Sequence, residues 1–364
     1  MTQSLGATNI RRVPSNTTDP NPANGPGFEP KGTESNKAKP NKELEPEHRF
    51  GIGEWYGKSF AHMPGDERRQ FAALQHIPKE QRPKQACPFL SRPGKSADCH
   101  KEGGICSLRS YERSRLTGEV KIDSRRSTLI TICPSRFEQN GTIHRWVNDV
   151  VLPNDNAISI GETPFLRRAP KATDTKESTR KAGRIDNILV VPATDPLRWC
   201  PIEKQAVYFS GKRMMLDFQV IATAVGDAIP FPVLRRRPDY RSSSAKRLLP
   251  QLETKVTALS KWGKKTAVVV DEDFFREFTP MEEEQHITNS EIIWFVVRYE
   301  LQTDRFTLIK GFTRMATLKN AIQAVVAAQP IPQPEFEQTL KTKLQARLNA
   351  AAILPSSQAP EKKS

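Results

Sequence analysis

The sequence predicts an α/β protein in which helices flank a mixed β-sheet, preceded by a small cysteine-rich module. Two observations lead to this expectation. From residue 185 onward, short apolar runs of the kind found in buried strands alternate with helical stripes. Before that point, four of the five cysteines fall within residues 87–133, among Gly, Ser and Arg residues that offer little apolar material for a core. The 364 residues allow one large or two smaller domains.

The two ends of the chain are polar. Residues 1–46 are rich in Pro, Asn, Gly, Ser, Lys and Glu and nearly free of large apolar side chains. Such a segment cannot offset the entropy that it would lose on ordering. We therefore expect a disordered tail at 1–46 and a flexible tail of similar composition at 353–364.

The elements between the tails follow from local patterns. Order is expected to begin with the stretch FGIGEWYG (50–57), whose large apolar residues suggest a short helical anchor. Polar, basic residues at 166–184 indicate an exposed loop. A helical stripe, with Pro250 near its start, is formed by Leu249, Leu252, Val256 and Leu259. Strands are expected at 185–191, 202–209, 266–270, 292–301 and 306–310, and two closing helices at 317–328 and 336–351.

The charge of the chain indicates a polyanionic partner. The formal net charge is +15 and the isoelectric point about 9.7, and release of counterions contributes much of the free energy of nucleic-acid binding. No stretch approaches the ~20 apolar residues that a membrane helix needs, and the N-terminus lacks the apolar segment of a secretory signal. We therefore expect no membrane association and a cytoplasmic location, where cysteines are metal ligands or free thiols more often than disulfides.

Four cysteines have the ligand count of a closed tetrahedral metal site. Cys87, Cys99, Cys106 and Cys133 are separated by 11, 6 and 26 residues. Sulfur donors suit zinc or iron, and this spacing does not distinguish the two metals. A proline follows Cys87 and Cys133 directly and stiffens the turn there. The alternative is four separate buried thiols. Cys200 stands apart and is expected to be a packed thiol.

The strings around these cysteines resemble the metal-binding region of the NotI-type restriction endonucleases. The similarity lies in IGEWYG (52–57), CPFL (87–90), Cys99, GGIC (103–106) and ICPSR (132–136), and it extends more thinly to about residue 345. The resemblance implies an iron atom held by the four cysteines beside the DNA. It also implies a PD-(D/E)XK nuclease core, and hence a metal-binding module at 47–140 and a nuclease domain at 141–352.

Two carboxylates lie on the first two expected strands. Asp186 begins one strand and Glu203 lies on the next, with 16 residues between them. Strand alternation places Glu203 and Gln205 on one face and Lys204 on the other. From the residues alone, surface carboxylates at a sheet end are the alternative interpretation. The resemblance implies instead that Asp186, Glu203 and Gln205 take the places of the family's Asp and E-x-Q residues, with Asp195 as a competing carboxylate.

In that interpretation Asp186 and Glu203 hold Mg²⁺, and the amide of Gln205 orients the attacking water or a phosphate oxygen. Residues 234–247 add a basic segment with six Arg or Lys residues. Arginine contacts phosphates or guanine edges, and the DNA-binding candidates are Arg235, Arg236, Arg237 and Arg241. The alternative for this segment is a solvated basic loop.

The function expected from these features is that of a type II restriction endonuclease. Such an enzyme hydrolyses phosphodiester bonds of double-stranded DNA at a specific, palindromic site in the presence of Mg²⁺. Symmetric cutting of both strands requires two active sites related by a two-fold axis, so a homodimer is expected. A non-catalytic DNA-binding protein with a metal knuckle is the alternative, and it differs only in lacking hydrolysis. The recognition sequence does not follow from the residues.

Overall fold

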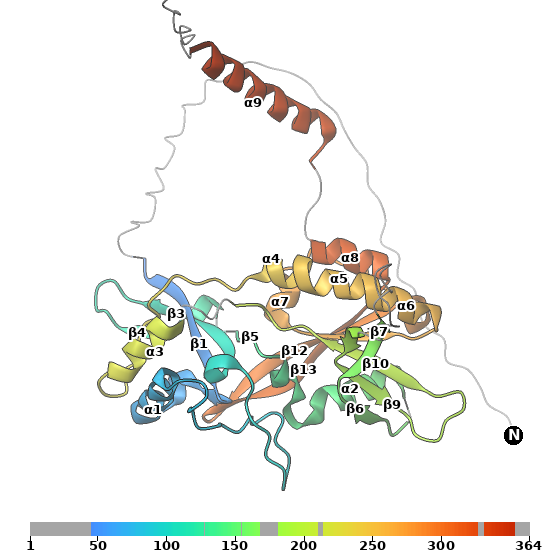
Figure 1. Cartoon of the computed structure of the whole chain (residues 1–364), viewed down its shortest axis with the longest axis horizontal. Helices are drawn as coiled ribbons and strands as arrows, with labels where there is room; N and C mark the ends of the chain where they lie inside the picture. Colours follow the sequence, from blue (N-terminus) through green and yellow to red (C-terminus); the bar gives the residue numbers. More distant parts are fainter. Residues whose placement is uncertain are drawn as a thin grey trace, which may run out of the picture. The chain divides into compact units, whose positions relative to one another are not determined.

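The computed structural model describes residues 45–126, 128–153, 155–167, 181–209, 214–326 and 331–353. Its centre is a six-stranded sheet in the order β13-β12-β11-β10-β9-β6 (Figure 1). Strands β10, β11 and β12 are parallel, whereas the pairs that they form with the outer strands are antiparallel. The predicted α/β class with a mixed sheet is confirmed. The strands are β6 Ile158–Ile160, β9 Asn187–Val190, β10 Trp199–Lys204, β11 Thr266–Asp271, β12 Ile292–Gln302 and β13 Arg305–Ala316.

The middle strands of this sheet are buried on both faces, and for this reason they form continuous apolar runs in the sequence. All six residues of β11 are buried. Val268 and Val270 pack into the apolar core on one face, and Ala267 and Val269 pack into the core on the other. The sheet is therefore the shared wall of two apolar cores.

A helical run over residues 240–261 and helix α8 (Leu318–Val326) pack into the first core (Figure 1). The predicted stripe is confirmed, since Leu252, Val256 and Leu259 are fully buried. The run begins earlier than expected, however, so Pro250 lies inside it. Proline donates no amide hydrogen, and π-helical turns flank it on both sides. The run consists of α4 Tyr240–Ser243, η6 Ser244–Leu248, α5 Leu249–Gln251, η7 Leu252–Val256 and α6 Thr257–Lys261.

The predicted helical anchor at 50–57 is wrong, because residues Glu47–Trp55 form strand β1 of a second sheet. This sheet has the order β2-β1-β3-β4, with β5 also paired to β3. Gly53 permits the close pairing, since a Cβ atom there would lie 2.9 Å from the backbone of Leu108. The pairing is non-local, so local apolar content did not reveal it. The other strands are β2 Lys58–Ser59, β3 Ile105–Arg113, β4 Val120–Ile122 and β5 Ile130–Thr131.

The second sheet shares its core with the central sheet. Ile52 and Trp55 from β1 pack in the same apolar cluster as Val268 and Trp294. A buried ion pair joins the sheets as well. Arg136 Nε lies 2.9 Å from Glu54 Oε2 of β1, and Arg136 Nη2 donates to the carbonyl oxygen of Phe306 in β13 at 3.0 Å. Residues on either side of the predicted division at 140 are thus in one continuous core.

The strand predicted at 202–209 lies earlier in the chain, at Trp199–Lys204. Beyond Lys204 the chain leaves β9, and the amide of Val207 donates to the carbonyl oxygen of Thr131 at 2.8 Å. The paired strands β7 (Thr163–Arg167) and β8 (Lys181–Ile185) occupy both ends of the loop predicted at 166–184, so the prediction is wrong there. The middle of that loop lies outside the described residues.

Both closing helices are present, as α8 and α9 (Gln333–Ile353). Of the predicted tails, residues 1–44 and 354–364 lie outside the described part of the chain. None of the described helices is long and apolar enough to cross a membrane. The remaining elements are η1 Phe60–His62, α1 Gly65–His76, η2 Glu102–Gly104, η3 Ser124–Arg126, η4 Pro134–Gly141, α2 Thr142–Val151, α3 Met214–Thr223, α7 Glu272–Arg276 and η8 Ile287–Asn289.

Candidate active site

The structure brings Asp186 and Glu203 together. Asp186 occupies a bend between β8 and β9, and Glu203 lies in β10. Extending the antiparallel register by one residue beyond the Asn187–Ile202 pair places Asp186 opposite Glu203. Asp186 Oδ2 accepts a hydrogen bond of 2.8 Å from the amide of Lys204, which fixes its carboxylate at the end of β10. Asp186 is half-buried, so its side of the pair is reachable from solvent.

Glu203 is buried but incompletely paired. Its Oε2 accepts a hydrogen bond of 2.7 Å from Lys255 Nζ, whereas its buried Oε1 has no hydrogen-bond partner within the described ranges. Burial, together with the nearby charge of Asp186, raises the pKa of Glu203 to about 7 against the opposing effect of Lys255. A buried carboxylate oxygen without a donor, next to a second carboxylate, suits a hard divalent cation.

Gln205 and Lys204 diverge as strand alternation predicts. Lys204 forms an ion pair with Glu138 of η4, which belongs to the face opposite Glu203. Gln205 follows β10, and its Nε2 donates to the carbonyl oxygen of Ala206 at 2.6 Å. The side-chain amide of Gln205 therefore contacts the backbone of the following residue.

Asp195 does not join the site. It is exposed and lies in the loop between β9 and β10, at the end of the hairpin away from Asp186 and Glu203. Glu203 is four residues along β10 from its start at Trp199, and a strand rises about 3.3 Å per residue. Asp195 therefore lies more than ~13 Å from Glu203 along the strand direction.

Lys255 is the site residue that sequence reasoning missed. It lies in η7, 52 residues after Glu203, and its side chain is 8% exposed. Lys255 follows Gln251 by one helical turn, and Gln251 Oε1 is a second acceptor at 3.4 Å from Nζ. No short motif links a strand glutamate to a lysine on a distant helix. A lysine beside Leu252 and Val256 of the buried stripe was the only signal that the sequence offered.

The four cysteines predicted to form a metal site lie in one region of the structure. Cys87 and Cys106 are buried against Phe89, and Cys99 packs on them from the side. Burial raises the pKa of the Cys99 thiol, and Cys87 and Cys133 raise it further, so their thiols lie within electrostatic range of one another. The sulfur atoms are not among the groups of three or more donors that lie within 4.8 Å of one another in the described residues.

The donor set of this cluster nevertheless fits a soft or borderline metal ion. All four ligand candidates are thiols, and the chain forms no disulfide among them. Lys101 lies near Cys99, where its charge lowers the thiol pKa against the effect of burial. Arg136 lies near Cys106, but its ion-pair partner Glu54 raises the pKa of that thiol more than Arg136 lowers it. Lys101 would therefore offset part of the negative charge of four thiolates. Cys200, by contrast, is fully buried, as expected of a packed thiol, and burial raises its pKa to about 12.

Six arginines line a cleft of about 670 Å³. The predicted segment contributes Arg235, Arg236 and Arg237, and the segments that connect β3, β4 and β5 contribute three more that the sequence did not indicate: Arg115, Arg125 and Arg126. Five of the six are exposed. Arg236 is buried and forms an ion pair with Asp217 of α3, so it holds the segment in place. Arg241 is exposed but does not line the cleft.

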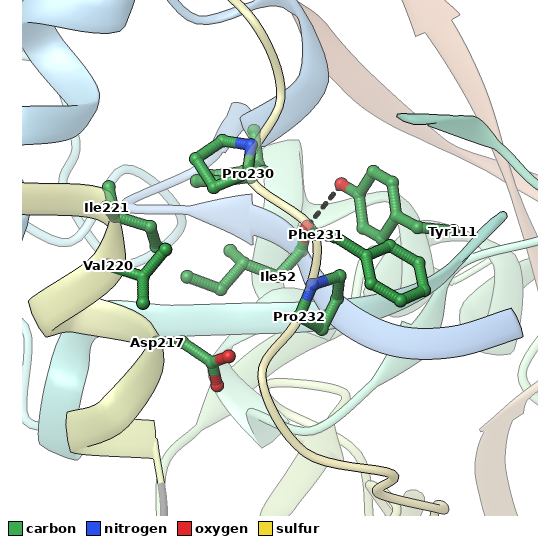
Figure 2. Close-up of a pocket in the computed structure, with 10 residues that line it drawn as sticks. Ile52, Tyr111, Asp217, Val220, Ile221, Pro230, Phe231 and Pro232 are labelled. Atoms are coloured by element: carbon green, nitrogen blue, oxygen red, sulfur yellow. Dashed lines mark hydrogen bonds between the residues drawn. The ribbon is translucent and has the colours of Figure 1, made fainter. Parts of the chain in front are cut away.

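Figure 2 shows the residues that precede the arginine segment and their surroundings. Residues Pro230, Phe231 and Pro232 pass over β1, and Asp217 lies beneath them (Figure 2). Asp217 Oδ1 accepts a hydrogen bond of 2.7 Å from the amide of Val233. The cavity enclosed here measures about 10 Å³, which is no more than a single water molecule needs and is too small for a substrate. The residues around it pack the stretch that leads into the arginine segment against β1.

A third group of polar residues, His48, Glu112 and Asp123, has donor atoms within 4.8 Å of one another. Its carboxylates are already engaged. Asp123 Oδ2 lies 2.9 Å from His48 Nδ1 and accepts from Ser110 Oγ at 2.8 Å, and Glu112 pairs with Lys121 at 3.2 Å. The Asp186–Glu203 pair differs because one of its buried oxygens has no such donor among the described residues.

The chain matches a known family over much of its length. The family model described as restriction endonuclease NotI covers residues 73–308, which is more than half of the 364 residues. The match includes the four cysteines, both carboxylates, Lys255 and the arginine segment, whereas His48 lies outside it. No curated protein matches the chain. The resemblance inferred from the cysteine strings is confirmed.

The pKa of Glu203 generates a prediction for metal binding. Since this carboxylate ionises near pH 7, protons should compete with a divalent cation below that pH. The apparent affinity for Mn²⁺ should fall by about tenfold for each pH unit between pH 7 and pH 5.5 and level off above pH 7.5. Calorimetric titration of the protein with Mn²⁺ over this range provides the measurement. An affinity that stays constant down to pH 5.5 would contradict the assignment of Glu203 as a ligand.

Proposed function

This chain belongs to the NotI restriction endonuclease family, and we propose that it is a type II restriction endonuclease that cuts double-stranded DNA at a specific, palindromic site with Mg²⁺ as cofactor. The observation that carries the proposal is the pairing of Asp186 with the buried, incompletely hydrogen-bonded carboxylate of Glu203. Carboxylate oxygens are the ligands that Mg²⁺ prefers. When bound, Mg²⁺ polarises the phosphate and lowers the pKa of a water molecule.

Three side chains of the protein would hold the metal ion and orient the reacting groups. Asp186 is half-buried and anchored by the amide of Lys204, so it presents a fixed carboxylate at the solvent side of the site. Glu203 supplies the inner ligand. Gln205 has an amide that both donates and accepts, and rotation away from the carbonyl of Ala206 would free it to orient the attacking water or a phosphate oxygen.

The arginine-lined cleft is the proposed DNA interface. Arg235 and Arg237 line it together with Arg125 and Arg126, and exposed guanidinium groups bind phosphates bidentately. Arg241 extends the basic surface along the same segment, while Arg236 acts through its ion pair with Asp217. Because the arginines come from two segments distant in sequence, the interface depends on the folded chain and not on one flexible loop.

We further propose a homodimer and a structural metal. Symmetric cuts in both strands of a palindrome require two copies of the Asp186–Glu203 site related by a two-fold axis. The cysteine cluster would hold one iron or zinc ion, with Lys101 offsetting part of the charge of the thiolates. The same cluster and the same cleft would serve a non-catalytic DNA-binding protein, so only hydrolysis separates the two functions.

The first prediction tests hydrolysis. Asp186→Asn should lower the cleavage rate by about 100-fold or more, because the metal's contribution of several kcal/mol disappears with its ligand. DNA binding should persist. Asp195→Asn, in the exposed loop of the same hairpin, is the matched control and should cut normally. Cleavage of a panel of genomic DNAs is the assay. If the wild-type protein binds this DNA and never cuts it, the binding-protein alternative is correct.

The second prediction tests the cleft. Replacing Arg235 and Arg237 together by Gln should weaken DNA binding and flatten its salt dependence, by about 0.9 in the log–log slope for each phosphate that the protein no longer neutralises. The control removes the same charge elsewhere, by replacing Lys341 and Lys343 of α9 with Gln, and should leave the slope nearly unchanged. Equal effects of the two double variants would indicate that only net charge matters.

The third prediction separates the two metals. After dialysis against a weak chelator, elemental analysis should find one tightly bound iron or zinc ion per chain, because thiolates hold such ions firmly, whereas Mg²⁺ stays largely hydrated. Cleavage should stop and return on addition of Mg²⁺. Cys106→Ser should lose the tight metal and thermal stability, and Cys200→Ser should keep both metal sites. Absence of stoichiometric iron or zinc from the wild-type protein would refute the cysteine site.

A further inference from the structure

We propose that Lys255 supplies the positive charge of the reaction centre by contacting an oxygen of the scissile phosphate. The inference rests on the proposed nuclease function and deepens it. The strand itself carries no cation on the face of Glu203, since Gln205 follows at the next position on that face and the intervening Lys204 is paired with Glu138 behind the sheet. The helical run provides the missing cation, which is Lys255.

The position of Lys255 is defined by two contacts. Its Nζ lies 2.7 Å from Glu203 Oε2 and 3.4 Å from Gln251 Oε1. A lysine ammonium has three N–H donors, so two of them have acceptors within the described part of the chain. The side chains of Lys255 and Glu203 are 8% and 3% exposed, so both groups are held in a site from which most water is excluded.

A structural ion pair alone does not account for this arrangement. Taking two charges out of water costs free energy that their attraction recovers only when the remaining hydrogen-bonding positions are filled. Here Glu203 Oε1 is buried without a donor among the described residues, and Asp186 places a second negative charge nearby. Arg136 and Glu54 show the contrast, because both carboxylate oxygens of Glu54 accept from Arg136.

The local backbone also marks the position. Lys255 lies in the π-helical turn Leu252–Val256, between two side chains of the buried stripe. Such turns are uncommon and frequently occur at functional sites. Arg247 on the same helical run lies over the ring of Tyr208 at 4.1 Å, so it is engaged elsewhere.

The charges of the site are consistent with phosphodiester hydrolysis. Two carboxylates and one ammonium carry a net charge of −1, which a divalent cation converts to +1, matching the single negative charge of a phosphodiester. In the reaction, the oxygen of water forms a new bond to phosphorus and the bond to the leaving oxygen breaks. The attacking water gives up a proton to solvent, and the leaving oxygen takes a proton from solvent. Lys255 remains protonated throughout and stabilises the charge that develops on a non-bridging oxygen.

The experiment compares single-turnover cleavage at saturating Mg²⁺ by wild type, Lys255→Met and Lys255→Arg. Removing the charge should lower the rate constant by about 100-fold or more at unchanged DNA affinity in Ca²⁺, and arginine should restore part of the rate. Lys261→Met, an exposed lysine at the end of the same helical run and outside the basic segment, is the matched control and should cut normally. Should Lys255→Met fail to fold, Lys255→Gln replaces it, since its amide still donates to Glu203.

Two outcomes would overturn the inference. If Lys255→Met, or Lys255→Gln in its place, cuts within about threefold of wild type, the charge has no role in the reaction. If the variant binds Mn²⁺ more weakly and saturating Mg²⁺ restores its full rate, Lys255 only positions Glu203. Failure of the proposed function is a separate result, because in that event the wild-type protein cuts none of the DNAs tested.

Discussion

The buried ion pair between Arg136 and Glu54 is the interaction on which the arrangement of the two sheets depends. Both side chains are completely buried, and Arg136 also donates to the carbonyl oxygen of Phe306 in the central sheet. Its guanidinium lies 4.5 Å from the rings of Phe89 and Tyr299. Removing one partner of such a pair typically costs about 3–5 kcal/mol, because the other charge stays buried. Arg136 therefore joins β1, the segment around Phe89 and strand β13.

That joint sets the path of the chain beyond Glu203. The amide of Val207 donates a hydrogen bond to the carbonyl oxygen of Thr131 in the second sheet, five residues before Arg136. The end of β10 is therefore attached to the second sheet as well as to the central one. Glu203 is consequently buried in a defined position against Lys255 and next to Asp186. Burial that raises its pKa disfavours the charged form without a cation, and the same burial strengthens its attraction to one.

Part of this could be predicted from the sequence. The parallel strands β11 and β12 are buried on both faces and appear as plain apolar runs, and the pairing of Asp186 with Glu203 follows from strand alternation and a hairpin connection. Strand β1 was missed because its pairing partners in β3 lie 50 to 66 residues away and its glycines suggested no strand. Lys255 and the cleft arginines near the second sheet, Arg115, Arg125 and Arg126, were missed for the same reason. They are single residues among 56 lysines and arginines, and only the tertiary fold brings them to a site.

The proposed binding of the divalent cation by Asp186 and Glu203 together is tested most directly by a crystal structure of the protein with Mn²⁺ and DNA, using the anomalous signal of the manganese. We expect a peak between the carboxylates of Asp186 and Glu203, within reach of Glu203 Oε1, and a phosphate beside Lys255. A peak at His48, Glu112 and Asp123, with none at Asp186 and Glu203, would contradict this proposal.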